Sequence, residues 1–379
     1  MRLFGRIFVA ATAALCLTST AVIGAASAAP APPRSAFRCL LDQTVNPSSG
    51  PVHGAILDVT APGIRFDGAA GKLVPGGRDQ RASDTFRTSS VTKTFTATVI
   101  LQLAERHRLD LDDRIGAYLD PALVDRVSVI DGVSYGSEIT IRQLLDHTAG
   151  LNDYVTDPQW FDTVLAQPHK GWTPAELVDW ALTHGSPYFR PGTGYHYSDT
   201  NYILAGYIIE KVTGRPLARA YRTQILDPLG MGRTYLEHWE APRGTLSHPF
   251  LGDIDTYGFN PTNDTFGGGG LVSTAAELTT FIRALFDGRL FRHDATLRTM
   301  LTTTAQSNNT YGLGIERKVQ PGGDIVWGHN GFLGAFMMYS PALRLSVTGT
   351  MNQAHPNLPL HLNAYRLAAG QAVPGCGGT

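Results

Sequence analysis

The sequence predicts a mixed α/β (α+β) fold in which strands from both ends of the chain share one sheet and a helical region is inserted between them. Strand-like residue patterns gather at about 45–90 and 287–379. Between them, over about 91–286, apolar residues recur mainly at the three- and four-residue spacing of helices. The chain has 379 residues, 43% of them hydrophobic, which suits a well-buried globular protein of one large or two intertwined domains.

Local residue patterns predict the individual strands and helices in chain order. Alternating residues predict strands at His53–Thr60, Ile64–Gly71 and Thr85–Thr88. Helical periodicity and capping signals predict helices over Lys93–Arg106, from Thr140 (capping box with Gln143), and over Pro174–Thr183, Thr200–Val212 and Thr274–Phe286. The pattern then returns to strands at Gly312–Arg317, Ile325–Gly328, Ala335–Tyr339 and Leu345–Met351, with a last helix over Leu360–Ala369.

Residues 1–28 have the pattern of an export signal. Arg2 and Arg6 precede an apolar stretch over 7–24, and Ala26-Ser27-Ala28 is a small-x-small cleavage site. An N-terminal membrane anchor is the alternative, but polar residues interrupt the apolar run and the cleavage site follows directly. No later segment is long and apolar enough to span a bilayer. We therefore expect a secreted, extracellular protein without membrane contact, whose mature chain, 29–379, is a single unit.

Charge and cysteine content narrow the function classes further. The formal net charge is −1 and no basic stripe is present, so nucleic-acid binding has no electrostatic support. Export leaves two cysteines, Cys39 and Cys376, and an oxidising compartment favours a disulfide between them; two unpaired thiols are the alternative. Two cysteines provide no metal framework, and no His-Glu-x-x-His motif occurs. We expect no metal or organic cofactor.

Ser90-Val91-Thr92-Lys93 places a lysine amine one helical turn from a serine hydroxyl. Ser90 follows a short strand and opens a helix, where free backbone N–H groups favour developing negative charge. A serine hydroxyl is a poor nucleophile until a neighbouring group takes its proton, and Ser-x-x-Lys is one arrangement that supplies such a group. A solvated lysine on an exposed first turn is the alternative.

Two later motifs favour the chemical interpretation. Tyr197-Ser198-Asp199 lies in a turn before a helix, where side chains project into a cleft. His329-Asn330-Gly331 follows an apolar run, and its glycine would let a substrate approach a strand edge closely. Taken singly, Tyr197 would be a packed aromatic and His329 a core histidine. Their order after Ser-x-x-Lys changes that interpretation.

With these motifs the sequence resembles the penicillin-recognising serine hydrolases, namely class C β-lactamases, exported D-alanyl-D-alanine carboxypeptidases and related esterases. Further signatures that carry the resemblance are Phe86–Ala97, Leu144–Leu151, Gly268–Thr274 and Tyr311–Gly314. The resemblance covers nearly the whole mature chain. It implies a β-lactamase/transpeptidase-like fold with a five-stranded antiparallel sheet, flanking helices and an all-helical domain. It also implies that the terminal helices pack together, which would bring Cys39 near Cys376.

The resemblance implies acyl transfer through an acyl-Ser90 intermediate. Lys93 and Tyr197 would take the serine proton and return one to the leaving group, so burial or the cations Lys93 and His329 would have to lower one ordinary pKa near 10. The oxyanion hole would consist of the backbone N–H groups of Ser90 and Phe332. A D-amino-acid peptide, an ester or a β-lactam would be the substrate, and the protein would be a monomer.

Several positions depart from the family pattern. Asp199 stands where asparagine is usual, which would favour the ammonium form of Lys93 and shift base duty toward Tyr197. Glu316 stands where the resembling carboxypeptidases have an arginine for the substrate's terminal carboxylate, and Asn330 and Phe332 replace assisting hydroxyl residues. If Glu316 points toward the cleft, it repels a free carboxylate and tolerates an amide or ester; the alternative is a solvated side chain without a role.

These departures favour a D-stereospecific peptidase or amidase. An esterase, a β-lactamase and a penicillin-binding sensor that acylates without turnover are the alternatives. Two other motifs are set aside. Gly132–Gly136 fits Gly-x-Ser-x-Gly, but its Ser134 is not followed at once by a helix, so we expect a surface turn. Gly267–Gly270 lacks the ending of a phosphate loop and is expected to be a tight turn before a helix capped by Thr274 and Glu277.

Overall fold

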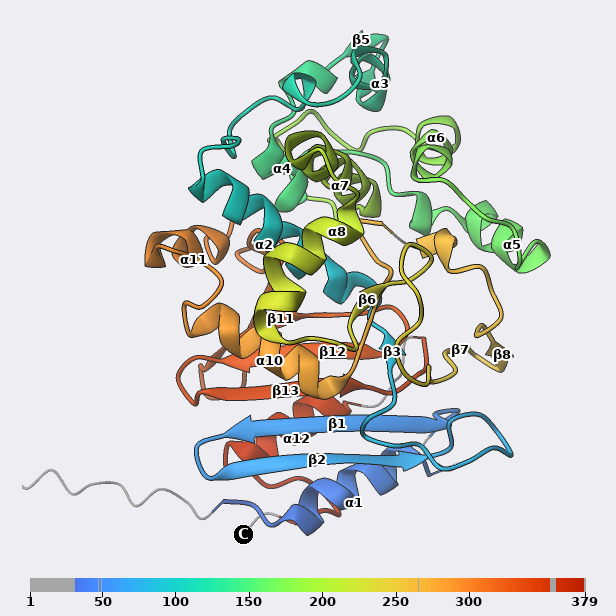
Figure 1. Ribbon diagram of the computed structural model, residues 1–379, viewed down its shortest axis with the longest axis vertical. Coiled ribbons are helices and arrows are strands. Elements are labelled where there is room, and N and C mark those ends of the chain that lie inside the picture. The colour runs from blue at the N-terminus through green and yellow to red at the C-terminus, as the bar shows by residue number, and fades with distance from the viewer. Residues whose placement is uncertain (1–30, 47, 49, 265, 355–358, 378–379) are drawn as a thin grey trace, which may run out of the picture. The chain divides into compact units, whose positions relative to one another are not determined.

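The computed structural model describes residues 31–46, 48, 50–264, 266–354 and 359–377 (Figure 1). In this part of the chain the main sheet is antiparallel and has six strands in the order β10-β11-β12-β13-β1-β2. Their bounds are β1 Gly54–Ala61, β2 Ile64–Gly71, β10 Glu316–Val319, β11 Ile325–Asn330, β12 Ala335–Ser340 and β13 Leu345–Thr350. Strands from both ends of the chain thus meet where β1 pairs with β13, as the sequence predicted.

Helices cover both faces of this sheet, so its central strands are buried on both sides. Every residue of β12 and β13 is buried. One face packs against α10 (Ala275–Phe286), and the other against α1 (Arg34–Thr44) and α12 (Leu360–Ala368), which also contact each other (Figure 1). The two faces belong to two separate apolar clusters. β12 is accordingly an almost continuous apolar run, whereas the polar residues of β13, Ser346, Thr348 and Thr350, are buried and form hydrogen bonds.

The inserted region is mostly helical and centres on α2 (Thr92–Glu105), whose residues are buried from Thr92 through Leu103. The helix α7 (Asp199–Thr213) packs against it. The other helices are α3 Pro121–Val127, α4 Ile141–Leu145, α5 Pro158–Ala166, α6 Pro174–His184, α8 Leu217–Tyr221, α9 Asp227–Leu229 and α11 Asp294–Met300. A small sheet connects this region to the main one; its strands are β3 Phe86–Arg87, β9 Leu271–Ser273 and β6 Tyr235–Leu236. The inserted region also contains two separate two-stranded hairpins. One pairs β4 Val129–Ile130 with β5 Val133–Ser134, and the other pairs β7 Phe250–Leu251 with β8 Ile254–Asp255.

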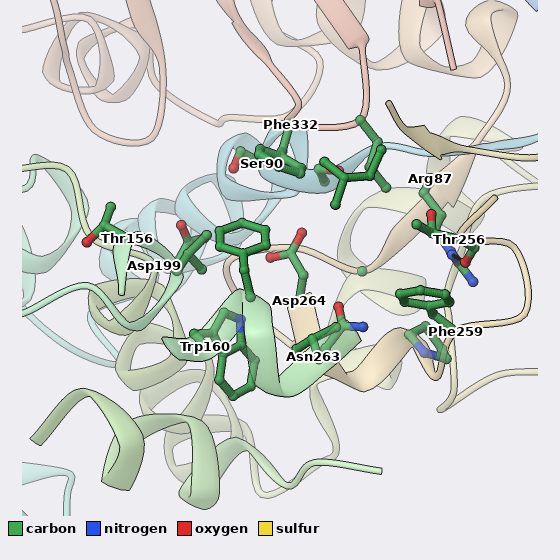
Figure 2. A pocket seen from close by; sticks show the side chains of 18 of the residues that line it. Arg87, Ser90, Thr156, Trp160, Asp199, Thr256, Phe259, Asn263, Asp264 and Phe332 are labelled. Carbon is green, nitrogen blue, oxygen red and sulfur yellow. Dashed lines mark hydrogen bonds between the residues drawn. The ribbon is translucent and has the colours of Figure 1, made fainter. Parts of the chain in front are cut away.

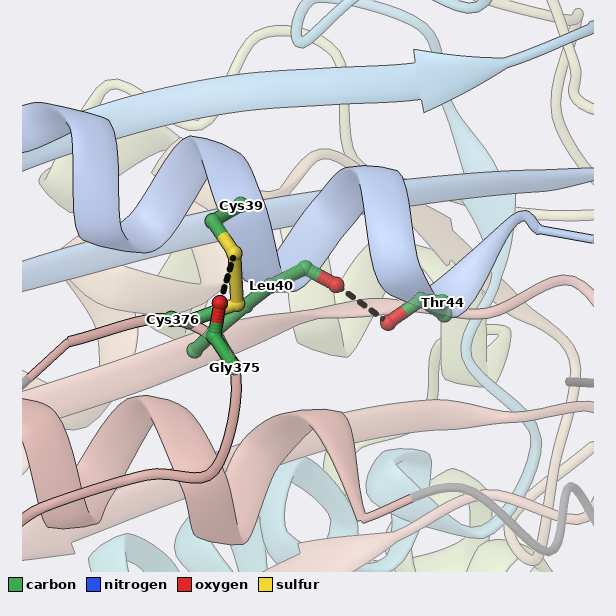
Figure 3. The surroundings of a disulfide bond; sticks show 5 residues. All are labelled: Cys39, Leu40, Thr44, Gly375 and Cys376. Carbon is green, nitrogen blue, oxygen red and sulfur yellow. Dashed lines mark hydrogen bonds between the residues drawn. A yellow bond between two sulfur atoms is a disulfide. The ribbon is translucent and has the colours of Figure 1, made fainter.

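Cys39 and Cys376 form a disulfide across a sequence separation of 337 residues (Figure 3). Cys39 lies on α1, and Cys376 follows α12 in the C-terminal segment. The contact between the two terminal helices brings the cysteines together. The bridge therefore joins the two ends of the described chain on one face of the sheet.

One predicted strand is displaced. Gly312–Arg317 was expected as a strand, but β10 begins only at Glu316. Gly314 has a φ of +71°, and a Cβ on Gly312 would lie 2.4 Å from the Met300 carbonyl oxygen, so this stretch is a tight loop packed on the helical region. The short β10 still adds a sixth strand, one more than the resemblance implied.

The structure tests only some of the other predictions about the chain's organisation. The predicted export signal, 1–28, lies outside the described residues, and a single mature unit over 29–379 stays a prediction. Within the described ranges, no helix combines the length and apolarity needed to cross a membrane. Ser134 lies on an exposed two-residue strand in the β4–β5 hairpin. That position agrees with the predicted surface turn rather than with a catalytic elbow.

Candidate active site

Ser90 lies on a sharp turn between β3 and α2. Backbone N–H and side-chain hydroxyl of Thr88 both donate to the Leu271 carbonyl, at 2.8 Å each, and anchor the turn to β9. Ser89 then has a φ of +45°, a left-handed conformation that costs energy for a residue with a side chain. The short 3₁₀ turn Ser89–Val91 leads directly into α2. This strained turn presents the Ser90 side chain at the wall of a cavity.

Lys93 lies beneath Ser90 and is fully buried. Its Nζ donates to Ser90 Oγ at 3.0 Å, to the Gly268 carbonyl at 2.9 Å, and to the carboxylate of Asp199. Three acceptors match the three N–H donors of an ammonium group. The ring of Tyr197 lies 4.9 Å from Nζ and adds a cation–π contact. The hydrogen bonds around Nζ therefore suit an ammonium group beside the serine, and the effect of the aspartate at position 199 on Lys93 stays a prediction.

Tyr197 is held above this lysine by the residues that precede α7. The His147 ring lies 4.3 Å from the Tyr197 ring, and His147 Nδ1 accepts hydrogen bonds from the Ser198 N–H and from Asn201, at 3.1 Å each. Burial, followed by the Asp199 carboxylate, raises the pKa of Tyr197 well above 10, and the Ser90 hydroxyl opposes this rise. One of the two pKa values, that of Lys93 or of Tyr197, was expected to be lowered; for Tyr197 the shift has the opposite direction, because desolvation and the nearby carboxylates outweigh the hydrogen bond with Ser90.

His329 does not supply a second cation. Its Nδ1 donates to the Asn330 carbonyl at 2.8 Å, and its Nε2 lies 2.9 Å from the Tyr311 hydroxyl, which donates to it. Burial is the largest cause that lowers the pKa of His329 below 6.5, so the ring is neutral at neutral pH. The hydrogen bond from Tyr311 instead lets His329 hold the Tyr311 ring in place. The centroids of the Tyr311 and Tyr197 rings are 6.1 Å apart.

Glu316 does not line the cavity either. Residues two apart share a strand face, and Lys318 Nζ lies 2.6 Å from Glu316 Oε2 on β10. Burial raises the pKa of Glu316, but His329 and Lys318 lower it more, so the net pKa is below 4.5 and the group is a carboxylate. The structure places Glu316 against Lys318 rather than among the residues that line the cavity, and a role of Glu316 in substrate choice stays a prediction.

Gly331 allows the turn after β11 to lie directly against the serine turn. A Cβ at Gly331 would come within 2.3 Å of the Thr88 carbonyl oxygen and 3.2 Å of the Ser89 Cβ. Only glycine permits this approach. The close contact places Phe332 at the cavity wall beside Ser90 (Figure 2). The predicted oxyanion hole, formed by the backbone N–H groups of Ser90 and Phe332, would lie where these two segments meet and stays a prediction.

The cavity above Ser90 has a volume of about 410 Å³ and mostly apolar walls. Figure 2 shows Ser90 and Phe332 on one side and Trp160 on the opposite side. The apolar lining residues are Val155, Trp160, Phe161, Val164, Leu165, Leu251, Phe259, Phe332 and Leu333. The Phe161 and Phe332 rings lie 5.8 Å apart and connect α5 with the turn after β11. Such walls suit an apolar substrate group.

The cavity has one cationic side chain among its described lining residues, Arg87. Its guanidinium donates four hydrogen bonds: Nε and Nη2 to Glu237 at 2.8 and 3.1 Å, Nη1 to the Thr256 carbonyl at 2.9 Å, and Nη2 to the Tyr257 carbonyl at 3.3 Å. A bidentate pair of this kind leaves little capacity for a second carboxylate.

Besides Glu237, two further acidic residues that were not predicted from the sequence line the cavity, Asp153 and Asp264. Burial and the neighbouring Asp199 raise the pKa of Asp153 to about 8 and that of Asp264 to about 7. The Gly268 carbonyl that holds Lys93 was missed as well, since Gly267–Gly270 was interpreted only as a turn. Thr274 does cap the following helix, accepting from the Glu277 N–H at 3.2 Å, but β9 intervenes. No local pattern marks these three positions.

Comparisons with known proteins agree with this geometry. A family model described as β-lactamase matches residues 51–372. The solved D-stereospecific amidohydrolase from Streptomyces sp. is 32% identical and has a TM-score of 0.77, with 90% of this chain and 100% of that chain covered. The D-amino acid amidase from Ochrobactrum anthropi SV3 is 25% identical with a TM-score of 0.70, covering 88% and 98%.

Among curated proteins, penicillin-binding protein 4* of Bacillus subtilis (strain 168) is 32% identical over 178 residues, which cover 47% of this chain and 36% of that protein. The matches to the first three curated relatives span 36%, 52% and 50% of their lengths. The family model, in contrast, covers most of this chain, including every motif that carried the resemblance. The chain therefore belongs to the β-lactamase family of penicillin-recognising enzymes and is a serine hydrolase.

Proposed function

We propose that the protein is a secreted, D-stereospecific amidase or peptidase that acts through an acyl-Ser90 intermediate. The observation that carries the proposal is the lining of the cavity, which is apolar and acidic and whose one described cation, Arg87, is already paired with Glu237. A substrate with a free terminal carboxylate finds no free cation among these residues, whereas an uncharged amide or ester meets no repulsion. The D preference is supported by the similarity to a D-stereospecific amidohydrolase across that protein's full length.

The proposed reaction begins with attack of Ser90 Oγ on the substrate carbonyl carbon. Ser90 gives its proton to Lys93 as Lys93 gives one to Asp199, so the ion pair serves as a relay in place of a free base. Backbone N–H groups of Ser90 and Phe332 stabilise the oxyanion. The raised pKa of Tyr197 keeps it a phenol, which suits donation to the leaving nitrogen. Water then hydrolyses the acyl ester by the reverse proton path.

Replacing Asp199 with asparagine tests this relay. We expect kcat at pH 7 to fall by about 10²–10⁴-fold, the usual worth of a general acid–base step, because an amide cannot accept the lysine proton. The measurement is kcat against pH from 6 to 10 for both proteins. A profile that Asp199→Asn leaves unchanged would contradict the relay and return base duty to Tyr197.

A substrate panel tests the function itself. We expect the protein to hydrolyse D-phenylalanine amide and D-phenylalanine p-nitroanilide faster than their L enantiomers and faster than a peptide ending in D-Ala-D-Ala with a free carboxylate. A simple p-nitrophenyl ester and a chromogenic cephalosporin complete the panel. Turnover confined to the ester would assign an esterase, and turnover of the cephalosporin a β-lactamase. Stoichiometric labelling by fluorescent penicillin without any turnover would assign a sensor.

Two further expectations belong to this proposal. Export is supported by the disulfide between Cys39 and Cys376, since such bonds persist in oxidising compartments. Recovery of the protein from the culture medium, with an N-terminus at residue 29, would establish it. The monomeric state stays a prediction, for which sedimentation equilibrium is the direct measurement.

A further inference from the structure

We propose that the acidic side of the cavity, formed by Asp153 and Asp264, binds a positively charged amino group of the substrate. The preferred substrates are then aminoacyl amides or esters whose α-amine is unblocked and whose side chain is apolar. This inference rests on the proposed function, because it takes Ser90 as the residue that attacks the acyl carbonyl.

Asp153 is 3% exposed, and what little of it is accessible lies at the cavity. Its Oδ1 accepts hydrogen bonds from the backbone N–H groups of Asp199 at 3.1 Å and Val155 at 3.3 Å. None of the described residues donates a hydrogen bond to its other oxygen, Oδ2. A capping role for the turn Tyr154–Thr156 accounts for Oδ1. It does not account for Oδ2, which accepts no hydrogen bond from the described residues and belongs to a side chain at the wall of the cavity.

Asp264 approaches from a different part of the chain, at the end of the 3₁₀ turn Pro261–Asp264. Figure 2 shows its carboxyl group projecting into the middle of the cavity, between Ser90 and Asn263. A Cβ on Gly269 would lie 2.9 Å from Asp264 Oδ1, so the side chain rests against the glycine segment whose Gly268 holds Lys93. No described residue forms an ion pair or hydrogen bond with its carboxyl group.

A count of charges shows what this side of the cavity lacks. Asp153, Asp199 and Asp264 gather around one ammonium group, that of Lys93, and Asp199 already pairs with it. Arg87 lowers the pKa of Asp264 only as the smallest of several causes and is itself paired with Glu237. Burial and the Asp199 charge raise the pKa of both remaining acids to about 8 and about 7. A substrate cation bound beside Asp153 and Asp264 would stabilise their carboxylate forms and lower these raised pKa values.

The position of the acids matches an α-amine. In an aminoacyl group the α-nitrogen lies about 2.5 Å from the carbonyl carbon, given standard bond lengths and angles. Asp199 links the nucleophile to the acidic side, since its carboxylate binds Lys93 beside Ser90 and its N–H donates to Asp153. The amine of a substrate attacked by Ser90 is therefore placed near these carboxyl groups. The side chain of the same substrate would then pack against the apolar wall around Trp160 and Phe161.

Binding of a substrate-like amine that cannot react provides the first test. D-phenylalaninol carries the amine and the apolar side chain but no carbonyl, and N-acetyl-D-phenylalaninol is its matched uncharged partner. We expect titration calorimetry on the wild-type protein at pH 7 to show the amine binding at least about tenfold more tightly. The amine should also release protons, seen as a heat that depends on the ionisation enthalpy of the buffer, because a bound cation lowers the raised pKa of Asp153 and Asp264.

The pH dependence has a definite sign. Between pH 5 and about 8 the amine should bind more tightly as pH rises, because the two acids become carboxylates while the ligand keeps its proton. Above that range affinity falls as the amine itself deprotonates. The charged and titratable groups around the acids are Lys93, Asp199, Arg87 and the buried phenol of Tyr154, whose pKa is raised well above 10. None of these four is expected to reverse the trend in this range.

Variants provide the second test. In Asp264→Asn and Asp153→Asn we expect the preference of kcat/KM for D-phenylalanine p-nitroanilide over its N-acetyl derivative to fall at least about tenfold. Asp162→Asn is the matched control, because Asp162 is an exposed carboxylate on α5; its ratio should equal that of the wild type. Should an aspartate variant fail to fold, the wild-type comparison of amine with N-acetyl ligand still decides.

The outcomes separate this inference from the function on which it rests. Equal or tighter binding of the N-acetyl ligand, or an unchanged preference in both folded variants, overturns the amine site even if D-amides are hydrolysed. Tight, proton-releasing binding of the amine supports the site even if the panel shows no amidase turnover, in which case only the proposed function fails.

Discussion

Ser90→Ala is expected to lower kcat by about 10⁶-fold on whichever panel substrate the wild type turns over, the loss seen when a catalytic serine is removed from other hydrolases. The physical reason is that Ser90 Oγ lies 3.0 Å from Lys93 Nζ and that, among the described residues, no other hydroxyl forms a hydrogen bond with this amine. Binding of an unreactive ligand should change little, because the substitution removes one hydroxyl and leaves the apolar residues of the cavity wall in place. The measurement is kcat and KM alongside calorimetric affinity.

The same residue should carry the covalent intermediate. After incubation with a fluorophosphonate or a penicillin, the intact mass should show one adduct, on a peptide that contains Ser90. Ser134→Ala is the matched control, because Ser134 is exposed on β5 and should leave labelling unchanged. An adduct that persists in Ser90→Ala would remove the assignment, and an adduct on Ser134 would restore the motif that was set aside.

Loss of the disulfide is expected to have the largest effect on stability. Closing a loop across 337 residues is worth on the order of 5 kcal/mol in the chain-entropy model, which assigns the effect to the unfolded state. For the double variant Cys39→Ser/Cys376→Ser we expect a loss of this size in the free energy of unfolding, and a melting temperature lower by roughly 5–10 °C. Denaturant titration and calorimetry give the two values.

The active site should be affected much less than stability by this double variant. The bridge lies between α1 and the C-terminal segment, and the neighbouring core cluster is on the face of the sheet opposite α10. We expect kcat within about twofold of the wild type below the melting transition. Two thiols titrated in the denatured, unreduced wild-type protein would show that the bridge is absent in the secreted molecule.

Much of the fold could be predicted from local patterns. The period of apolar residues identified α2, α6, α7 and α10, and the strands at both ends of the chain indicated one shared sheet. These features depend on neighbours within a few residues, which is the range over which capping, alternation and helical spacing act. The loop at Gly312–Arg317 was not predicted, because its conformation depends on contact with Met300 and not on its own residue pattern.

The pairing of Ser90, the predicted nucleophile, with Lys93 could also be predicted locally, since a spacing of three residues on a helix places both on one face. The electrostatics of the site could not. Asp199 is 106 residues from Lys93 in the chain, and Gly268 is 175 residues away, yet both bind the same ammonium group. Whether Glu316 faces substrate or Lys318, and whether Tyr197 is more or less acidic than usual, depended on strand packing and burial.

The sequence alone was thus sufficient to predict the family, the shared sheet and the Ser-x-x-Lys pair, because each of these depends on residues that are only a few positions apart. Only the folded chain brought Asp153 and Asp264 to the cavity and left their charge uncompensated. The physical reason is that desolvation and charge balance are sums over everything that surrounds a group in space, and most of those neighbours are distant in sequence.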